Sequence, residues 1–218
     1  MFKAIRDERS AFLFKVLPDA GSSLFYMAWT TTPWTLPSNL GLTVGAQIEY
    51  VLVQTFNPYT HLPVNVVLAR ALLGKYFKAE DENGGFESYE ASSKSIPWKV
   101  LHSFRGTDIA ECRYEQLIPT DAGSLVNIRE ITPDADPFRI VTGDFVTTED
   151  GTGIVHTAPA FGADDYKAGK KNKLGILILV DKKGKFVEGV GEFSGRYVKN
   201  YKDDPEYVDV NVDICVKL

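Results

Sequence analysis

The sequence has few of the residues that mark a secreted or membrane-bound protein. It contains only two cysteines, Cys112 and Cys215, about a hundred positions apart, which is neither a disulfide framework nor a metal-binding spacing. No apolar run approaches the length of a transmembrane helix, and the charged first residues lack the apolar stretch of a signal peptide. We therefore expect a soluble protein in a reducing compartment, the cytoplasm, with no membrane partner.

Histidine is scarce as well, with three in the chain. His61 and His102 have no second ligand at a metal-binding spacing, and His156 with the acidic pair Asp164 and Asp165 makes an incomplete ligand set. The sequence also shows no combination of Ser or Cys with His and an acid that would predict a nucleophilic hydrolase. We expect no metal and no cofactor in this chain.

An excess of positive charge is missing too. The net charge is −5 and the pI is about 5.3, which argues against tight, sequence-independent binding of nucleic acid. Lysines nevertheless cluster in one region of the sequence. The simpler interpretation is the solvated face of a helix, and the alternative is a basic rim that guides a single-stranded RNA end. These lysines are Lys167, Lys170, Lys171 and Lys173, followed by Lys182, Lys183 and Lys185.

What the chain does contain is enough apolar material for one core. It has 218 residues, of which 44% are hydrophobic and 12% aromatic, and we expect a single domain over residues 1–218, monomeric by default. Residues 80–96 are polar and glycine-containing, with too little apolar content for a core of their own, and predict a surface insertion.

Many short apolar or alternating segments, separated by Pro, Gly and Asn, predict a β-rich α+β fold. We expect a closed or half-closed, distorted β-barrel decorated with short helices. Strands are predicted at residues 11–17, 23–32, 48–55, 64–68, 98–104, 138–142, 154–155, 176–180 and 207–216, helices at 70–78 and 163–171, and a partly ordered helix or bend at 109–117.

The chain is organised around residues 29–39, W-T-T-T-P-W-T-L-P-S-N, which we call the threonine motif. Successive threonines of an extended segment point to opposite faces, and Pro33 ends the strand because it has no N–H for a ladder. The motif alone is as typical of a strand with a capped turn as of a site. As a site, its hydroxyls, backbone amides and one amide side chain suit a sugar, an amino acid or an ester.

A second segment, residues 151–166, reads G-T-G-I-V-H-T-A-P-A-F-G-A-D-D-Y, and we call it the Gly-His-Asp motif. Gly151 and Gly153 indicate a close approach of the backbone to another group. His156 follows a short buried strand, and Asp164 and Asp165 suit the first turn of a helix. The simpler interpretation of each is structural, a hydrogen-bonded histidine and a helix cap.

Together, the two motifs are very similar to the paired signatures of the editing (connective peptide 1) domain of isoleucyl-tRNA synthetases. Valyl and leucyl editing domains look like T-T-x-R-P-E-T or T-T-R-P-D-T, with A-V-K or A-V-M at Ile154-Val155-His156, so the resemblance is specific. The chain has no H-I-G-H and no K-M-S-K-S, the motifs that such synthetases use to activate an amino acid. It therefore looks like an excised domain, and its long polar insertion resembles the eukaryotic cytosolic enzyme.

The resemblance implies a reaction, hydrolysis of the ester in mischarged valyl-tRNA(Ile), and roles for individual residues. The partners implied are the 3′ end of that tRNA with its aminoacyl group, bound weakly and in a salt-sensitive way, and the rest of the synthetase chain. Asp165 would bind the substrate ammonium, and His156 would line the amino-acid pocket and exclude isoleucine. The remaining candidates are Thr30, Thr31 and Thr32 for the ribose, carbonyl and water, and Trp34, Thr35, Asn39, Gly153 and Asp164 for substrate binding.

Two other functions stay open at this point. One is a non-catalytic β-barrel that binds an RNA end or a protein, in which the threonine motif is structural; retained affinity without deacylation would identify it. The other is a standalone hydrolase of small aminoacyl esters or D-aminoacyl-tRNA, which would be indifferent to the valine side chain.

Overall fold

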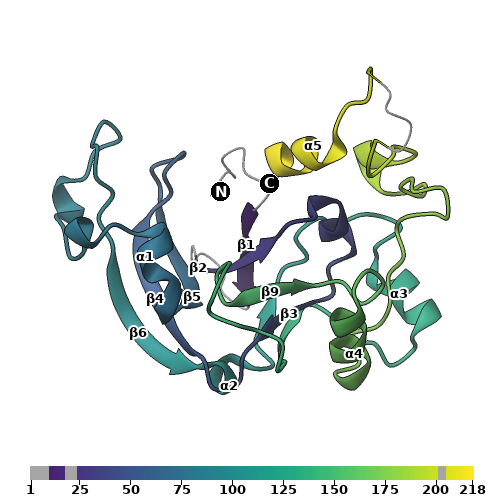
Figure 1. Cartoon of the computed structure of the whole chain (residues 1–218), viewed down its shortest axis with the longest axis horizontal. Helices are drawn as coiled ribbons and strands as arrows, with labels where there is room; N and C mark the ends of the chain where they lie inside the picture. The colour runs from purple at the N-terminus through teal and green to yellow at the C-terminus, as the bar shows by residue number, and fades with distance from the viewer. Residues whose placement is uncertain (1–9, 18–23, 201–204) are drawn as a thin grey trace.

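A computed structural model describes residues 10–17, 24–200 and 205–218 (Figure 1). Within these ranges, nine strands form one mixed sheet in the order β1-β7-β8-β3-β9-β2-β5-β4-β6. The sheet is curled, because β1 pairs with both β7 and β2 and so joins six of the strands into a ring of pairings. The strands are β1 (Ser10–Leu17), β2 (Leu24–Thr30), β3 (Gly41–Val44), β4 (Glu49–Phe56), β5 (Pro63–Ala69), β6 (Lys99–Arg105), β7 (Arg113–Tyr114), β8 (Arg139–Thr142) and β9 (Ile154–Thr157).

Strand β2 is where this ring meets the rest of the sheet. It pairs with β1 in an antiparallel register from Ser10↔Thr30 to Lys15↔Phe25. Its other edge is shared, since Leu24–Tyr26 pair in parallel with β5 while Trp29 pairs with Val155 of β9. Strands β5, β4 and β6 continue away from the ring as a separate part of the sheet, which we call the wing and which lies at the left of Figure 1.

Short helices surround the sheet, so the predicted β-rich, distorted barrel decorated with short helices is confirmed. Among the described residues, no helix has both the length and the apolar character that a membrane crossing requires. The α-helices are α1 (Leu73–Tyr76), α2 (Gly106–Ile109), α3 (Leu125–Ile131), α4 (Ala163–Lys171) and α5 (Val210–Lys217), and the 3-10 helices are η1 (Pro33–Ser38), η2 (Arg70–Leu72), η3 (Ala79–Asp81), η4 (Phe86–Ser88) and η5 (Gly191–Phe193).

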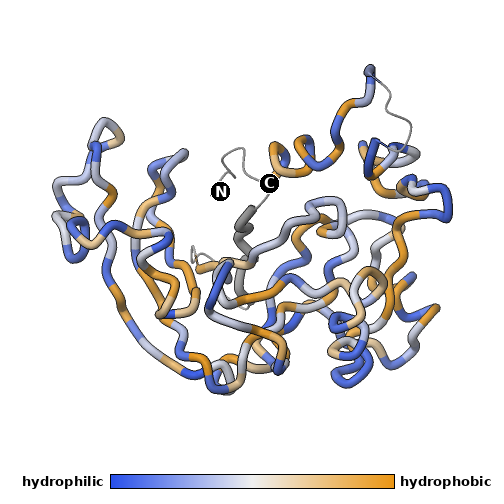
Figure 2. The backbone as a smooth tube through the Cα atoms, viewed as in Figure 1, coloured by the Kyte–Doolittle hydropathy of each residue, from blue (hydrophilic) through white to orange (hydrophobic). Residues whose placement is uncertain are grey.

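Two hydrophobic clusters hold these elements together. The larger joins strands of the ring to β4 of the wing and includes Leu42, Tyr50 and Ile140. The smaller lies in the wing and includes Val53 and Trp98. Figure 2 shows hydrophobic residues along β4 and β5 and mostly hydrophilic residues in the loops that follow α1, where the polar segment 80–96 lies at the surface. Within the wing, β5 is largely buried whereas the edge strand β6 is mostly exposed.

The prediction of a strand at residues 207–216 is wrong, because the segment forms α5. Asp209 caps this helix, and its carboxylate accepts a hydrogen bond from the Asn211 backbone N–H at 2.9 Å. Val210 and Ile214, four positions apart, are fully buried, whereas Val212 and Val216 are exposed. Valines that alternate with polar residues satisfy a period of two, but burial here follows the helical period.

Three further segments differ from the prediction. Residues 176–180 make no strand of the sheet: Val180 forms an isolated bridge with Phe186, and Ile178 is 57% exposed. The predicted helix or bend at 109–117 contains the two-residue strand β7. Helix α3 was not predicted; the Ser124 side chain caps it by accepting from the Asn127 N–H. The segment between the strands predicted at 11–17 and 23–32, together with residue 23, lies outside the described residues.

Candidate functional site

A pocket of about 170 Å³ opens where the end of β2 meets β9. Every residue that lines it comes from one of the two motifs, although these are separated by more than a hundred positions of sequence. The pairing of Trp29 with Val155 brings the motifs together. The lining residues are Trp29, Thr30, Thr31, Thr32, Thr35, Val155, His156, Ala158, Phe161 and Asp165.

The threonines are arranged by a tight turn rather than by a strand. Strand β2 ends at Thr30, whose Oγ1 accepts a hydrogen bond from the Thr32 N–H at 3.1 Å. Pro33 then begins the 3-10 helix η1, and the Thr35 N–H donates to the Thr32 carbonyl at 2.9 Å. The hydroxyls of Thr30, Thr32 and Thr35 therefore line one pocket, in place of the alternating faces expected of an extended run.

His156 forms the floor of the site and is 6% exposed. Its Nε2 lies 2.9 Å from Thr35 Oγ1, and its Nδ1 lies 2.8 Å from Asn39 Nδ2. Burial lowers the pKa of the imidazole from 6.5 to about 3. The ring is therefore neutral at physiological pH, and both of its nitrogens are engaged, so it is poorly suited to take a proton from water.

Asp165 supplies the carboxylate of the pocket from the first turn of α4. Its Oδ2 accepts a hydrogen bond from the Ala158 N–H at 2.9 Å, which ties the end of the β9 segment to the helix. Burial raises the pKa of this carboxyl, the nearby Asp164 adds to the rise, and the Ala158 N–H opposes it. A partly buried carboxylate among hydroxyls is a suitable partner for a substrate ammonium group.

Comparison with known proteins was made for the whole chain. No protein-family model matches. The isoleucine–tRNA ligase of Cytophaga hutchinsonii is 43% identical over 242 residues, covering 100% of this chain and 21% of the relative. That of Porphyromonas gingivalis is 43% identical over 219 residues, covering 98% of this chain and 18% of the relative. Over nearly its whole length, this chain is similar to one segment of isoleucine–tRNA ligases.

This result confirms the family that the two motifs indicated, and the chain spans about a fifth of the length of these ligases. Both relatives are bacterial enzymes, which does not support the resemblance to the eukaryotic cytosolic one. A solved structure of the P. falciparum cytosolic leucyl-tRNA synthetase editing domain shares part of the fold, with a TM-score of 0.48 and 16% identity over 71% of this chain and 48% of that one. This partial likeness concerns the fold alone.

Four residues that were predicted to bind substrate lie outside the pocket lining. The Trp34 ring packs edge-on against Phe161, a lining residue, with ring centroids 5.0 Å apart, and its backbone N–H donates to Asn211 Oδ1 of α5 at 2.9 Å. Asn39 lies behind His156. The exposed Asp164 pairs with Lys167, and Gly153 lies at the start of β9.

Trp29, Val155, Ala158 and Phe161 line the pocket but were not among the predicted site residues. All four belong to the two motifs, so position within the motifs would have found them. Within the described residues, no group of three or more His, Cys, Asp or Glu side chains is placed to hold a metal ion. The expectation of a metal-free, cofactor-free site stays a prediction.

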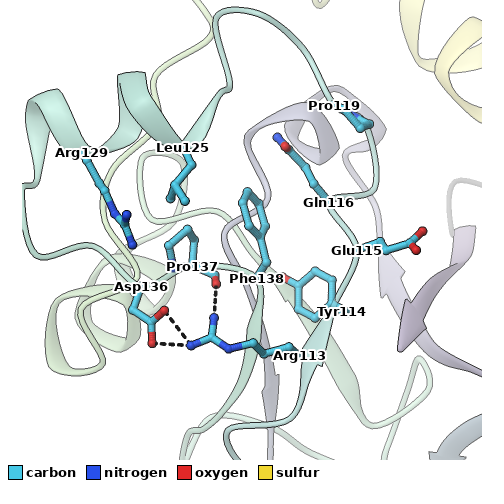
Figure 3. Close-up of a pocket in the computed structure, with 10 residues that line it drawn as sticks. All are labelled: Arg113, Tyr114, Glu115, Gln116, Pro119, Leu125, Arg129, Asp136, Pro137 and Phe138. Atoms are coloured by element: carbon cyan, nitrogen blue, oxygen red, sulfur yellow. Dashed lines mark hydrogen bonds and ion pairs between the residues drawn. The ribbon is translucent and has the colours of Figure 1, made fainter. Parts of the chain in front are cut away.

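A larger pocket of about 480 Å³ contains no residue of either motif (Figure 3). Arg113 at its rim is held by both carboxylate oxygens of Asp136, each at 2.8 Å, and by the Pro137 carbonyl. Figure 3 shows the Tyr114 and Phe138 rings beside one another in this lining. The arginine is already neutralised locally, so this pocket offers a weaker anion site than its residues suggest.

The predicted lysine group is also partly neutralised. Lys167 pairs with Asp164 at 3.1 Å and Lys173 pairs with Asp134 at 2.9 Å, whereas Lys170 and Lys171 are exposed in the last turn of α4. Basic residues there complement the helix dipole. The solvated helix face is thus sufficient to account for this part of the group, and a basic rim for RNA stays a prediction.

Gly153 is required by backbone packing, and we expect Gly153→Ala to destabilise the fold. Its φ is +77°, and an added Cβ would lie 2.4 Å from the Ala69 Cβ. Overpacking costs about 1–3 kcal/mol and a left-handed alanine about 1–2 kcal/mol, so we expect a loss of about 2–4 kcal/mol in the free energy of unfolding, measured by urea denaturation.

Gly74→Ala is the matched control. Gly74 lies in α1 with no other atom within 4 Å of an added Cβ, and alanine there should stabilise the helix by about 0.5–1 kcal/mol. Equal denaturation midpoints for the two variants would contradict the packing role of Gly153.

Proposed function

We propose that this chain is an editing domain that hydrolyses the ester joining a wrong amino acid, chiefly valine, to the 3′ end of tRNA(Ile). The observation that carries the proposal is the small pocket built wholly from the two motifs. It combines three kinds of group that such a reaction needs: hydroxyls, one carboxylate, and a neutral polar ring. The ring can limit the length of an aliphatic side chain that fits.

The need for a second pocket follows from the limits of binding. A site that fits isoleucine cannot strongly refuse valine, because one methylene changes binding by only about 1–3 kcal/mol; this is the general figure for which isoleucyl-tRNA synthetase is itself the standard example, and not one obtained from this structure. A smaller site that admits valine and rejects isoleucine removes the error. The pocket built from the two motifs is small, with a volume of about 170 Å³.

The chemistry asks little of the protein. Water adds to the ester carbonyl, the bond to the ribose oxygen breaks, and that oxygen leaves with a proton. In the proposed arrangement Asp165 holds the α-ammonium by a charge-assisted hydrogen bond. The hydroxyls and amides of residues 30–32 surround the carbonyl and the attacking water, where donors favour the developing negative charge.

His156 has a different part in this scheme. A pKa of about 3 and a hydrogen bond at each ring nitrogen make it a poor general base. Its rigid, buried ring is instead suited to bounding the space for the amino-acid side chain. Selectivity, rather than proton transfer, is therefore the contribution we assign to it.

The test is deacylation of valyl-tRNA(Ile) and isoleucyl-tRNA(Ile), measured with this chain and with a full-length ligase that contains it. The proposal expects valyl-tRNA(Ile) to be hydrolysed faster than isoleucyl-tRNA(Ile). Equal hydrolysis of both, and of D-aminoacyl-tRNA, would favour a standalone esterase. No hydrolysis by either protein, with tRNA still bound, would leave a non-catalytic RNA-binding module.

A further inference from the structure

Tyr114 belongs to neither motif, yet its hydroxyl is connected to the pocket. It lies on β7, is 1% exposed, and its OH donates to Asn39 Oδ1 at 2.6 Å. Its ring packs edge-on against Phe138, with centroids 6.4 Å apart. The tyrosine is thus fixed by packing, and its hydroxyl points at the residue that contacts His156.

The donor and acceptor in each hydrogen bond between Asn39, His156 and Thr35 can be assigned, because the backbone carbonyls of Gly41 and Thr32 at either end can only accept. Asn39 Nδ2 lies 2.8 Å from the Gly41 carbonyl, which can only accept, so this atom is the amide NH2. The same NH2 faces His156 Nδ1 at 2.8 Å, so Nδ1 must accept. The ring proton is therefore on Nε2 and is donated to Thr35 Oγ1, whose own proton goes to the Thr32 carbonyl at 2.8 Å.

We propose that Tyr114 is a positioning residue that, through Asn39, holds His156 in the neutral Nε2–H form and thereby sets the amino-acid selectivity of the pocket. The selectivity part rests on the proposed editing function. The Asn39 amide is held at both ends: Nδ2 donates to the Gly41 carbonyl, and Oδ1 accepts from the Tyr114 hydroxyl, so Tyr114 supplies one of the two restraints against rotation. If the amide turned over, its oxygen would face Nδ1, and that nitrogen would then have to carry the proton.

Such a change would reach the pocket at Thr35. With the proton on Nδ1, Nε2 becomes an acceptor, and the Thr35 hydroxyl would have to turn away from the Thr32 carbonyl to donate to it. Thr32 and Thr35 both line the pocket, so the reversal alters the hydroxyls presented to substrate as well as the ring. A buried phenol outside the motifs therefore contributes, together with the Gly41 carbonyl, to the polarity of the site.

The test is the Tyr114→Phe variant, which removes only the hydroxyl. The imidazole nitrogens are observed by NMR of 15N-labelled protein, and with three histidines in the chain the His156 signals are assigned by one substitution. We expect wild type to show a protonated Nε2 and a bare Nδ1. Tyr114→Phe should show a Nδ1–H or mixed population, and the ratio of valyl to isoleucyl deacylation should fall about tenfold, the effect of one lost buried hydrogen bond.

Tyr26→Phe is the matched control, because Tyr26 is buried in the same core and lies outside the pocket lining. It should change neither readout. Wild-type nitrogen signals and selectivity in a folded Tyr114→Phe protein would overturn the positioning role while leaving the editing function intact. A tautomer shift in a protein that deacylates no tRNA would uphold the coupling to His156 and reject the editing function.

Asn39→Asp provides a second, independent measurement. A carboxylate can only accept hydrogen bonds, so at 2.8 Å it would force a proton onto His156 Nδ1 and raise the pKa of the ring. We expect a Nδ1–H signal and an imidazolium that persists to higher pH than in wild type. A neutral Nε2–H ring in this variant would overturn the proposal.

Discussion

Replacing Asp165 by alanine should slow deacylation of valyl-tRNA(Ile) about 100-fold or more. Removing one partner of a buried, charged hydrogen-bonded pair costs about 2–5 kcal/mol, and here the substrate ammonium would be left without a counter-ion. The variant also loses the acceptor for the Ala158 N–H. Single-turnover deacylation with the enzyme in excess is the measurement, since it isolates the hydrolytic step.

Asp165→Asn separates the two roles of the side chain. Its amide oxygen can still accept from the Ala158 N–H, so the turn should survive while the negative charge is lost. Because burial raises the pKa of Asp165, wild-type activity should decline on acidification at a higher pH than for an ordinary aspartate, and the asparagine variant should lack this decline. Asp134→Ala, an exposed carboxylate paired with Lys173, is the control. A wild-type rate in Asp165→Asn would exclude ammonium binding.

Replacing His156 by alanine should extend hydrolysis to isoleucyl-tRNA(Ile). In the proposed arrangement, the buried ring would occupy the space into which a longer side chain reaches, and one methylene is worth about 1–3 kcal/mol, or roughly 10- to 150-fold in selectivity. In the His156→Ala variant, the ratio of the valyl-tRNA(Ile) to the isoleucyl-tRNA(Ile) deacylation rate should therefore lose most of this factor. Because His156 has so low a pKa, the rate with valyl-tRNA(Ile) should keep its pH dependence near neutrality.

The cost in stability must be measured alongside. The substitution leaves Asn39 and Thr35 without their buried partner, which should lower the free energy of unfolding by about 1–3 kcal/mol. His102→Ala, on the exposed face of β6, is the control and should change neither selectivity nor stability. Continued rejection of isoleucyl-tRNA(Ile) by a folded His156→Ala protein would assign selectivity to other residues.

The two segments that form the pocket were predicted from their resemblance to paired editing-domain motifs, and local signals added only the approximate ends of elements. Pro33 begins η1 shortly after β2 ends at Thr30, glycines precede β9, and acidic residues begin α4, so these signals near the ends of elements were visible in the sequence. Tyr114 carried no such signal. It lies in a two-residue strand whose pairings, with β1 and β8, join residues far apart in the chain.

At residues 207–216 the sequence carried a clear local signal, but that signal predicted the wrong element. Residues 207–216 alternate between apolar and polar types, and valine favours strands, so local propensity and pattern agreed on the wrong element. Packing decided the outcome: Val210 and Ile214 are buried in the main core, and the contacts of α5 with η1 reward the helix. Tertiary burial overrides propensity in such short segments.

The hydrogen bond between the Trp34 N–H and Asn211 bears on how this domain is cut for experiments. Every residue that lines the pocket lies before position 166, so a truncation after α4 would keep the whole reactive surface. It would nevertheless remove the residue that anchors η1, together with the Asn211 amide contact to the Val198 carbonyl. A fragment that ends before α5 keeps every pocket residue but loses the hydrogen bond from the Trp34 N–H to Asn211. Low activity in such a fragment would therefore report the loss of this anchor of η1, and not a defect in the residues that line the pocket.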